Sequence, residues 1–146
     1  MGVKRVWIIE KGNSRWKIGE FSDDALINVT TTDVGVILTD LNLPKSDSKS
    51  IDILITGSGN WSNDTLELLK SKGNVTQLRH GDSHPLRTNV TNPGSLGTDR
   101  IANAFAIQEG VIDEALTGNA WLIVDVGTCI TFDLVVDGTH LGGAIS

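Results

Sequence analysis

The chain has 146 residues, of which 39% are apolar and 21% charged, so it is neither a disordered tail nor a fibre. Its length suggests a single domain. Eighteen acidic against twelve basic residues give a net charge of −6, which disfavours non-specific nucleic-acid binding. No apolar run is long enough to span a membrane, and no apolar signal core follows Lys4 and Arg5. Cys129 is the single cysteine, which excludes an internal disulfide, and we expect a cytoplasmic protein without membrane or nucleic-acid partners.

The first part of the chain predicts an antiparallel meander of three strands. Its strand segments are rich in β-branched and aromatic residues, and turn residues separate them at Lys11-Gly12-Asn13 and Asp23-Asp24. Residues 33–41 favour a short helix, and 44–50 a loop. The predicted strands are 3–10, 14–21 and 25–31.

The rest of the chain alternates strands with helices. A buried-strand pattern at 51–56 precedes a helix that Ser62 or Asn63 caps and that runs to Lys72. A short strand at 75–78 precedes a helix from 98 to 116, with Gly118 at its exit. A hairpin of 121–126 and 129–136 follows, with Asp137-Gly138 as the next turn. This order predicts an α/β fold with a mixed sheet.

One pattern occurs twice: an apolar strand, an acid, any residue and a glycine, at Glu10-Lys11-Gly12 and again at Asp125-Val126-Gly127. The repeat predicts two similar domains, residues 1–118 and 119–146, with only the opening hairpin of the second present. Alternatively, the last hairpin completes a single sheet. A glycine turn lets phosphate oxygens approach backbone N–H groups, and an acid beside it can hold a cation. Two such hairpins facing one cleft would bind the β- and γ-phosphates of a nucleotide.

Four ordered motifs resemble those of the type III pantothenate kinases, a family of the acetate kinase/sugar kinase/Hsc70/actin superfamily. They are EKGNSRWK at 10–17, PGSLGTDRIA at 93–102, VDVGTCITFD at 124–133 and DGTHLGGAI at 137–145. The resemblance implies a ribonuclease-H-like, actin-like ATPase fold and the phosphorylation of pantothenate by ATP to 4'-phosphopantothenate. That reaction is the first step of coenzyme A synthesis. The resemblance also implies a divalent cation such as Mg²⁺, a monovalent cation (K⁺ or NH₄⁺) and a homodimer.

The resemblance assigns roles residue by residue. Asp99 matches the general base, Asp125 the monovalent-cation ligand and Thr128 a contact to ATP phosphate. The predicted substrate site is Val90, Gly97, Thr98, Asp99 and Arg100, and the predicted ATP hairpin is Glu10, Lys11, Gly12, Asn13, Ser14, Arg15, Trp16 and Lys17. A carboxylate at the start of a helix is stabilised there and can accept a hydroxyl proton. Arg100 suits the carboxylate of the substrate. The simpler interpretation of Asp99 is an ordinary helix N-terminal acid paired with Arg100.

Three departures from the family pattern favour a second hypothesis, a non-catalytic nucleotide-binding or regulatory member of the superfamily. Glu10 stands where the family has Asp, and Val90 stands where it has Tyr. The family also continues beyond the last motif, so we predict that residues 1–146 alone phosphorylate pantothenate slowly. A different phosphotransferase or phosphatase of the superfamily is a third hypothesis, which the Gly97-Thr98-Asp99-Arg100 motif disfavours.

Overall fold

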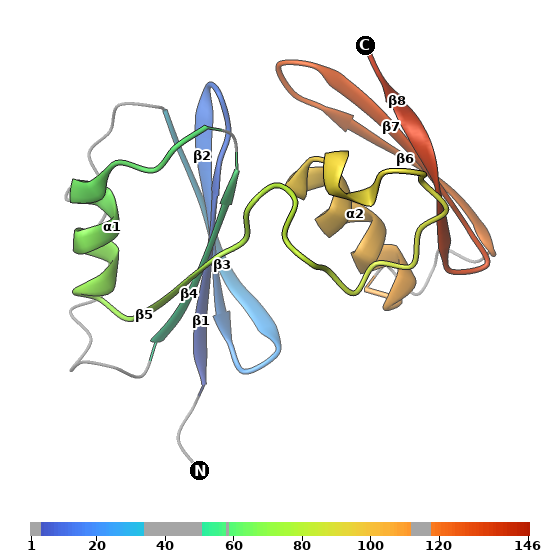
Figure 1. Cartoon of the computed structure of the whole chain (residues 1–146). Coiled ribbons are helices and arrows are strands. Elements are labelled where there is room, and N and C mark those ends of the chain that lie inside the picture. Colours follow the sequence, from blue (N-terminus) through green and yellow to red (C-terminus); the bar gives the residue numbers. More distant parts are fainter. Residues whose placement is uncertain (1–3, 34–50, 58, 112–117) are drawn as a thin grey trace. The chain divides into compact units, whose positions relative to one another are not determined.

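A computed structural model describes residues 4–33, 51–57, 59–111 and 118–146 (Figure 1). The chain divides into two compact units, Met1–Leu78 and Arg79–Ser146. The helix predicted at 33–41 and the loop at 44–50 lie outside the described residues, apart from Asp33, which ends a strand. None of the described helices is long and apolar enough to cross a membrane.

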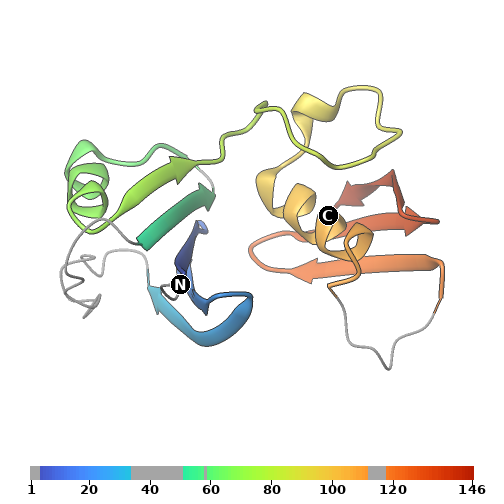
Figure 2. The same ribbon diagram turned by 90° about the horizontal axis from the view of Figure 1, so that it is seen from below.

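The first unit is a five-stranded mixed sheet in the order β3-β2-β1-β4-β5, with a helix, α1, on one face (Figures 1 and 2). The antiparallel pairs β1–β2 and β2–β3 confirm the predicted meander. Strand β4 pairs in parallel with both β1 and β5, so the sheet is mixed as predicted. The elements are β1 (Arg5–Lys11), β2 (Arg15–Ser22), β3 (Ala25–Asp33), β4 (Ile51–Gly57), α1 (Asn63–Lys70) and β5 (Asn74–Gln77).

The core of this unit follows from strand alternation, which places every second side chain on the α1 face. Ile9 pairs with Ile18 on β2 and with Ile55 on β4, and all three are buried. Leu69 of α1 is fully buried against this cluster. The N-terminus of α1 is capped as predicted, because the Ser62 hydroxyl accepts a hydrogen bond from the Thr65 N–H at 3.2 Å.

The second unit is a three-stranded antiparallel sheet in the order β6-β7-β8, with helix α2 on one face. The hairpin β6–β7 and the Asp137-Gly138 turn were both predicted, and both turn residues have positive φ. The third strand was not predicted, because two adjacent glycines weaken its strand pattern. Its Gly143 is required by close packing, since a Cβ there would overlap the Phe132 carbonyl of β7. The elements are η1 (Pro93–Ser95), α2 (Thr98–Gln108), β6 (Ala120–Val126), β7 (Ile130–Val136) and β8 (Thr139–Ile145).

Helix α2 ends at Gln108, whereas the sequence predicted a helix that continues to Leu116. The prediction is wrong for residues 109–111, which are not helical. Gly110 has a φ of 70°, and the N–H groups of Gly110 and Val111 donate to the carbonyls of Ile107 and Ala106. This bond pattern is a Schellman motif, in which a left-handed glycine ends the helix. The predicted exit at Gly118 is therefore replaced by Gly110, and residues 112–117 lie outside the described part.

The face of the second sheet that α2 does not cover is apolar, and we call it the open face. Residues on it pair across strands, Leu122 with Leu134 and Val126 with Ile130. Leu122 is 66% exposed and Val126 is 72% exposed. Helix α2 lies against the opposite face of this sheet (Figure 1).

The repeated pattern forms a strand, a short glycine connection and a second antiparallel strand in both units. Glu10 is the next-to-last residue of β1, and Asp125 is the next-to-last residue of β6. A connection of three residues that starts with glycine follows each strand: the Gly12 N–H donates to the Arg15 carbonyl, and the Gly127 N–H to the Cys129 carbonyl. The compact units divide after Leu78, whereas the repeat places a domain boundary near residue 118, and that boundary stays a prediction.

Candidate active site

The predicted ATP hairpin joins β1 to β2 in the first unit. Its Gly12 has no room for a side chain, because a Cβ there would lie 2.7 Å from the Arg15 carbonyl oxygen. The Glu10 carboxylate and the Lys17 ammonium are 3.4 Å apart across the two strands. Asn13 and Ser14 are exposed at the tip of the turn. The hairpin thus presents backbone and hydroxyl groups at its tip, with an ion pair at its base.

Lys11 of this hairpin contacts the segment that precedes α1. Its ammonium donates to the Asn60 carbonyl at 2.7 Å and lies 5.8 Å from the centre of the Trp61 ring. Trp61 also packs edge-on against Trp16, with the ring centres 5.2 Å apart. Trp61 was not singled out from the sequence, although a cation beside an aromatic ring is a common arrangement. This cluster fixes the ends of both hairpin strands to the loop after β4.

In the second unit, the Gly97-Thr98-Asp99-Arg100 motif forms the N-terminus of α2. Gly97 is the N-cap, and a Cβ at this position would overlap Oδ1 of Asp99. Thr98 is buried, whereas Asp99 is exposed in the first turn. Among the described residues, none donates a side-chain hydrogen bond to the Asp99 carboxylate. An acid with this placement is stabilised by the helix dipole and is open to a ligand.

Arg100 does not pair with Asp99, as the simpler interpretation of the motif expected. Its Nε and Nη2 bind Asp133 of β7, with the shortest distance 2.7 Å from Nη2 to Oδ1. The two side chains are 11% and 2% exposed. The hydrogen bond to Asp133 raises the pKa of Arg100, burial opposes this rise, and the nearby charges of Asp133 and Asp99 add to it. Arg100 therefore remains charged inside the unit.

Asp133 has a second partner that the sequence did not reveal. Nε2 of His140, which is fully buried, lies 2.7 Å from Oδ1 of Asp133. Nδ1 of the same ring lies 2.9 Å from the Thr88 hydroxyl, which accepts a hydrogen bond from the Val90 N–H. The motif residue Arg100 and the predicted substrate residue Val90 are thus joined by one chain of hydrogen bonds.

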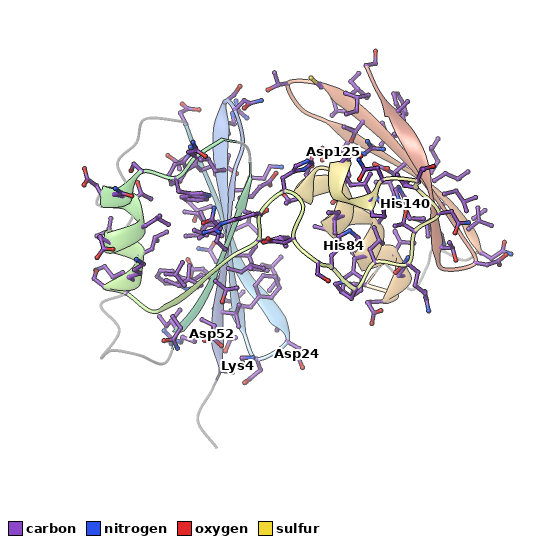
Figure 3. All side chains as sticks on the ribbon, viewed as in Figure 1. Lys4, Asp24, Asp52, His84, Asp125 and His140 are labelled. Carbon is purple, nitrogen blue, oxygen red and sulfur yellow. The ribbon has the colours of Figure 1, made fainter. Side chains whose placement is uncertain are left out.

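Asp125 lies on the α2 side of the second sheet, as does His140 (Figure 3). Its Oδ2 accepts a hydrogen bond of 3.3 Å from the Asn103 amide. Asn103 is four residues after Asp99, so the two side chains share one face of α2. This spacing is a signal that could have added Asn103 to the predicted site. Thr128 is exposed in the turn after β6.

The residues around Asp125 fit a cation that is held largely by oxygen atoms of a bound phosphate. Within the described ranges, no group of three or more His, Cys, Asp or Glu side chains could enclose a metal. Mg²⁺ in kinase sites is bound through one or two carboxylates together with substrate phosphates, so a lone carboxylate is compatible with it. Asp125 is the carboxylate of the second unit that would contribute.

The second unit brings together Val90, Gly97, Thr98, Asp99, Arg100 and Asp125, and the first unit brings together residues 10–17. The predicted arrangement, in which Glu10 and Asp125 face one cleft, stays a prediction.

Comparison with solved structures identifies the class of this fold. The chain aligns over 96% of its length with a Baf family transcriptional activator from Campylobacter jejuni, with a TM-score of 0.58 and 21% identity. It also aligns over 96% of its length with a 2-dehydro-3-deoxygalactonokinase from Sinorhizobium meliloti, with a TM-score of 0.56 and 13% identity. It covers 53% and 52% of those chains. The fold is that of the sugar kinases and actin-like ATPases, as predicted.

A sequence model of the family described as type III pantothenate kinase matches residues 6–146. Proteins of that name are 32% identical over 141 residues in Azobacteroides pseudotrichonymphae and 26% identical over 140 residues in Flavobacterium psychrophilum. These alignments cover 95% and 94% of this chain, which spans 55% and 56% of those relatives. The chain belongs to the type III pantothenate kinase family. It spans about half the length of these curated relatives.

Proposed function

We propose that the protein to which this chain belongs transfers the γ-phosphoryl group of ATP to the primary hydroxyl of pantothenate. The observation that carries the proposal is the contrast between two carboxylates of the second unit. Asp133 is buried and accepts hydrogen bonds from two side chains, whereas Asp99 is exposed at a helix N-terminus and accepts none from a described side chain. A residue that must accept a proton from a substrate needs the second environment.

Asp99 is the general base in this proposal. Phosphoryl transfer depends mainly on positioning and charge stabilisation, and the attacking hydroxyl loses its proton to a nearby carboxylate. Asp99 lies in the first turn of α2, where the helix dipole favours a negative charge. Gly97 leaves room for its carboxylate, because a side chain at this position would meet Oδ1.

Arg100 binds the pantothenate carboxylate. The guanidinium already donates Nε and Nη2 to Asp133, and it holds further N–H groups that can meet a second anion. A planar guanidinium can bridge two carboxylates in this way. Thr98 and Val90 contribute to the walls of the substrate site, and the Val90 position sets its shape where the family has a tyrosine.

The two glycine hairpins bind the phosphates of ATP. Backbone N–H groups and the hydroxyl of Ser14 or Thr128 are the donors, and residues 10–17 supply the cationic side chains. Mg²⁺ and a monovalent cation (K⁺ or NH₄⁺) would neutralise phosphate charge when bound, and Asp125 would hold the monovalent cation. We also propose a homodimer in the cytoplasm, which sedimentation analysis and cell fractionation would test.

The experiment is a phosphorylation assay with Asp99→Asn, in which the amide keeps the size of the side chain but cannot take up the proton. Loss of a general base lowers turnover by roughly 10²- to 10⁴-fold, and ATP affinity should stay within about twofold of the wild type. Asp64→Asn is the matched control, because Asp64 is the first-turn acid of the other helix, α1. Near-normal turnover in Asp99→Asn would exclude the base role. A wild-type protein that binds ATP and leaves pantothenate unchanged would favour the non-catalytic hypothesis.

A further inference from the structure

Four side chains of the second unit form a connected set, which we call the Arg100 network: Arg100, Asp133, His140 and Thr88. They come from α2, from β7, from β8 and from the segment before η1. The distances along the chain are 2.7 Å from Arg100 Nη2 to Asp133, 2.7 Å from His140 Nε2 to Asp133 and 2.9 Å from His140 Nδ1 to Thr88. Helix α2 is therefore linked by polar contacts to β7, and through β7 and β8 to the segment before η1.

The protons of the network can be assigned from its partners. The Asp133 carboxylate accepts hydrogen bonds from Nε and Nη2 of Arg100, and we assign the hydrogen between Asp133 and His140 to Nε2 of the ring, which then donates to the same carboxylate. In the neutral ring Nδ1 then accepts a hydrogen bond from the Thr88 hydroxyl, whose oxygen accepts one from the Val90 N–H. From Asp133 through His140 and Thr88 to Val90, each donor therefore meets an acceptor, which stabilises a buried polar network.

This arrangement fixes the orientation of the Arg100 guanidinium. A long arginine side chain loses considerable rotamer freedom when it is held in one place, and a single flexible partner would hold it only loosely. Here the partner is itself fixed, because His140 is fully buried between Asp133 and Thr88. Nη1 of Arg100 donates to none of the described residues. Nε and Nη2 of Arg100 thus donate to Asp133, and this contact fixes the direction in which the remaining N–H groups point.

We propose that His140, acting through Asp133, is a positioning residue that aims Arg100 at the carboxylate of the substrate. This inference rests on the proposed function, in which Arg100 binds the pantothenate carboxylate. His140 holds the Asp133 carboxylate in place against the guanidinium. The same imidazole holds Thr88, which in turn holds the Val90 backbone, so one side chain aligns two parts of the substrate site.

The kinetic test uses the complete gene product, with pantothenate and with the analogue in which a carboxamide replaces the carboxylate. His140→Phe keeps the ring volume and removes both hydrogen bonds. It should raise the KM for pantothenate about tenfold and leave kcat within about twofold. The reason is that the contact to the substrate carboxylate is made equally in the substrate complex and in the transition state. The KM for the carboxamide should change less than about twofold. His140→Gln, which can still donate to Asp133, should restore most of the pantothenate KM.

Val135→Ala is the control for a merely structural effect, since Val135 is fully buried and pairs with His140 across β7 and β8. This variant loosens the same core without removing a polar contact. It should therefore change the KM for pantothenate and the KM for the carboxamide by the same factor. The proposal would be overturned if His140→Phe raised the KM for pantothenate and the KM for the carboxamide equally. It would also be overturned if Val135→Ala raised the KM for pantothenate alone.

A second measurement does not depend on activity. The Nε–H resonance of Arg100, assigned by its absence in Arg100→Lys, should exchange with solvent at least tenfold faster in His140→Phe than in the wild type, and His140→Gln should restore most of the protection. Unchanged exchange in His140→Phe would overturn the positioning role. If the wild type phosphorylates neither substrate, the proposed function fails, and this exchange rate still decides whether His140 positions Arg100.

Discussion

Asp133→Asn tests how strongly the second unit depends on one buried charge pair. The variant keeps the shape of the side chain and removes its charge, so the Arg100 guanidinium, whose side chain is 11% exposed, loses the carboxylate with which it forms its ion pair. Breaking a buried ion pair from one side costs about 3–5 kcal/mol, because the remaining charge stays desolvated. His140 also loses a charged acceptor at 2.7 Å. The cost is a large fraction of the stability of a small domain.

Hydrogen exchange of the β7 amides measures this cost within the second unit alone. A loss of about 3–5 kcal/mol accelerates exchange through opening by between roughly one hundredfold and several thousandfold. The matched control is Glu67→Gln on α1, whose ion pair with Lys70 has a similar length of 2.9 Å but side chains that are 73% and 58% exposed. An exposed pair of this kind contributes about 0.3–0.5 kcal/mol, so the α1 amides should accelerate less than about threefold. Exchange in β7 of Asp133→Asn within tenfold of the wild type would refute the reasoning.

Three further substitutions test local features. Gly97→Ala displaces the Asp99 carboxylate without backbone strain, so turnover should fall by roughly a hundredfold while the melting temperature stays within a few degrees of the wild type; unchanged turnover would contradict this. Ser62→Ala removes the acceptor of the Thr65 N–H and should lower the free energy of unfolding by about 1 kcal/mol, measured by urea denaturation. Gly110→Ala forces a side chain into a φ of 70° and should cost about 1–2 kcal/mol in the same assay; a stabilised variant would show that the Schellman motif does not need glycine.

The strands of the first unit could be predicted because their patterns are local. Alternating isoleucines mark β4, and the Asp23-Asp24 turn separates β2 from β3. The end of α2 was placed too late, because apolar residues continue at helical spacing beyond Gly110 and a single glycine is ambiguous in a sequence. The strand β8 was missed for a related reason. Two adjacent glycines are typical of a loop in a sequence. In the structure Gly143 is needed because the Phe132 backbone of β7 leaves no room for a side chain.

The motif residues of the site could be predicted from their resemblance to a family, but their partners could not. The spacing of Asp99 and Arg100 suggested that they pair with each other. Arg100 instead pairs with Asp133, which is 33 residues away and lies in another element. His140 belongs to the last of the four motifs, and the resemblance assigns it no role. Its role depends on contacts at separations of 7 and 52 residues, which no local pattern contains.

The open face of the second sheet determines how this polypeptide behaves in solution. Several large apolar side chains lie side by side on it, and a net charge of −6 on the whole chain supplies the opposing repulsion. Sulfate salts screen that repulsion and strengthen apolar association, whereas cooling weakens apolar association. Self-association of the 146-residue chain should therefore increase with the concentration of ammonium sulfate and with temperature. Purification in the cold at low salt should keep the chain from associating.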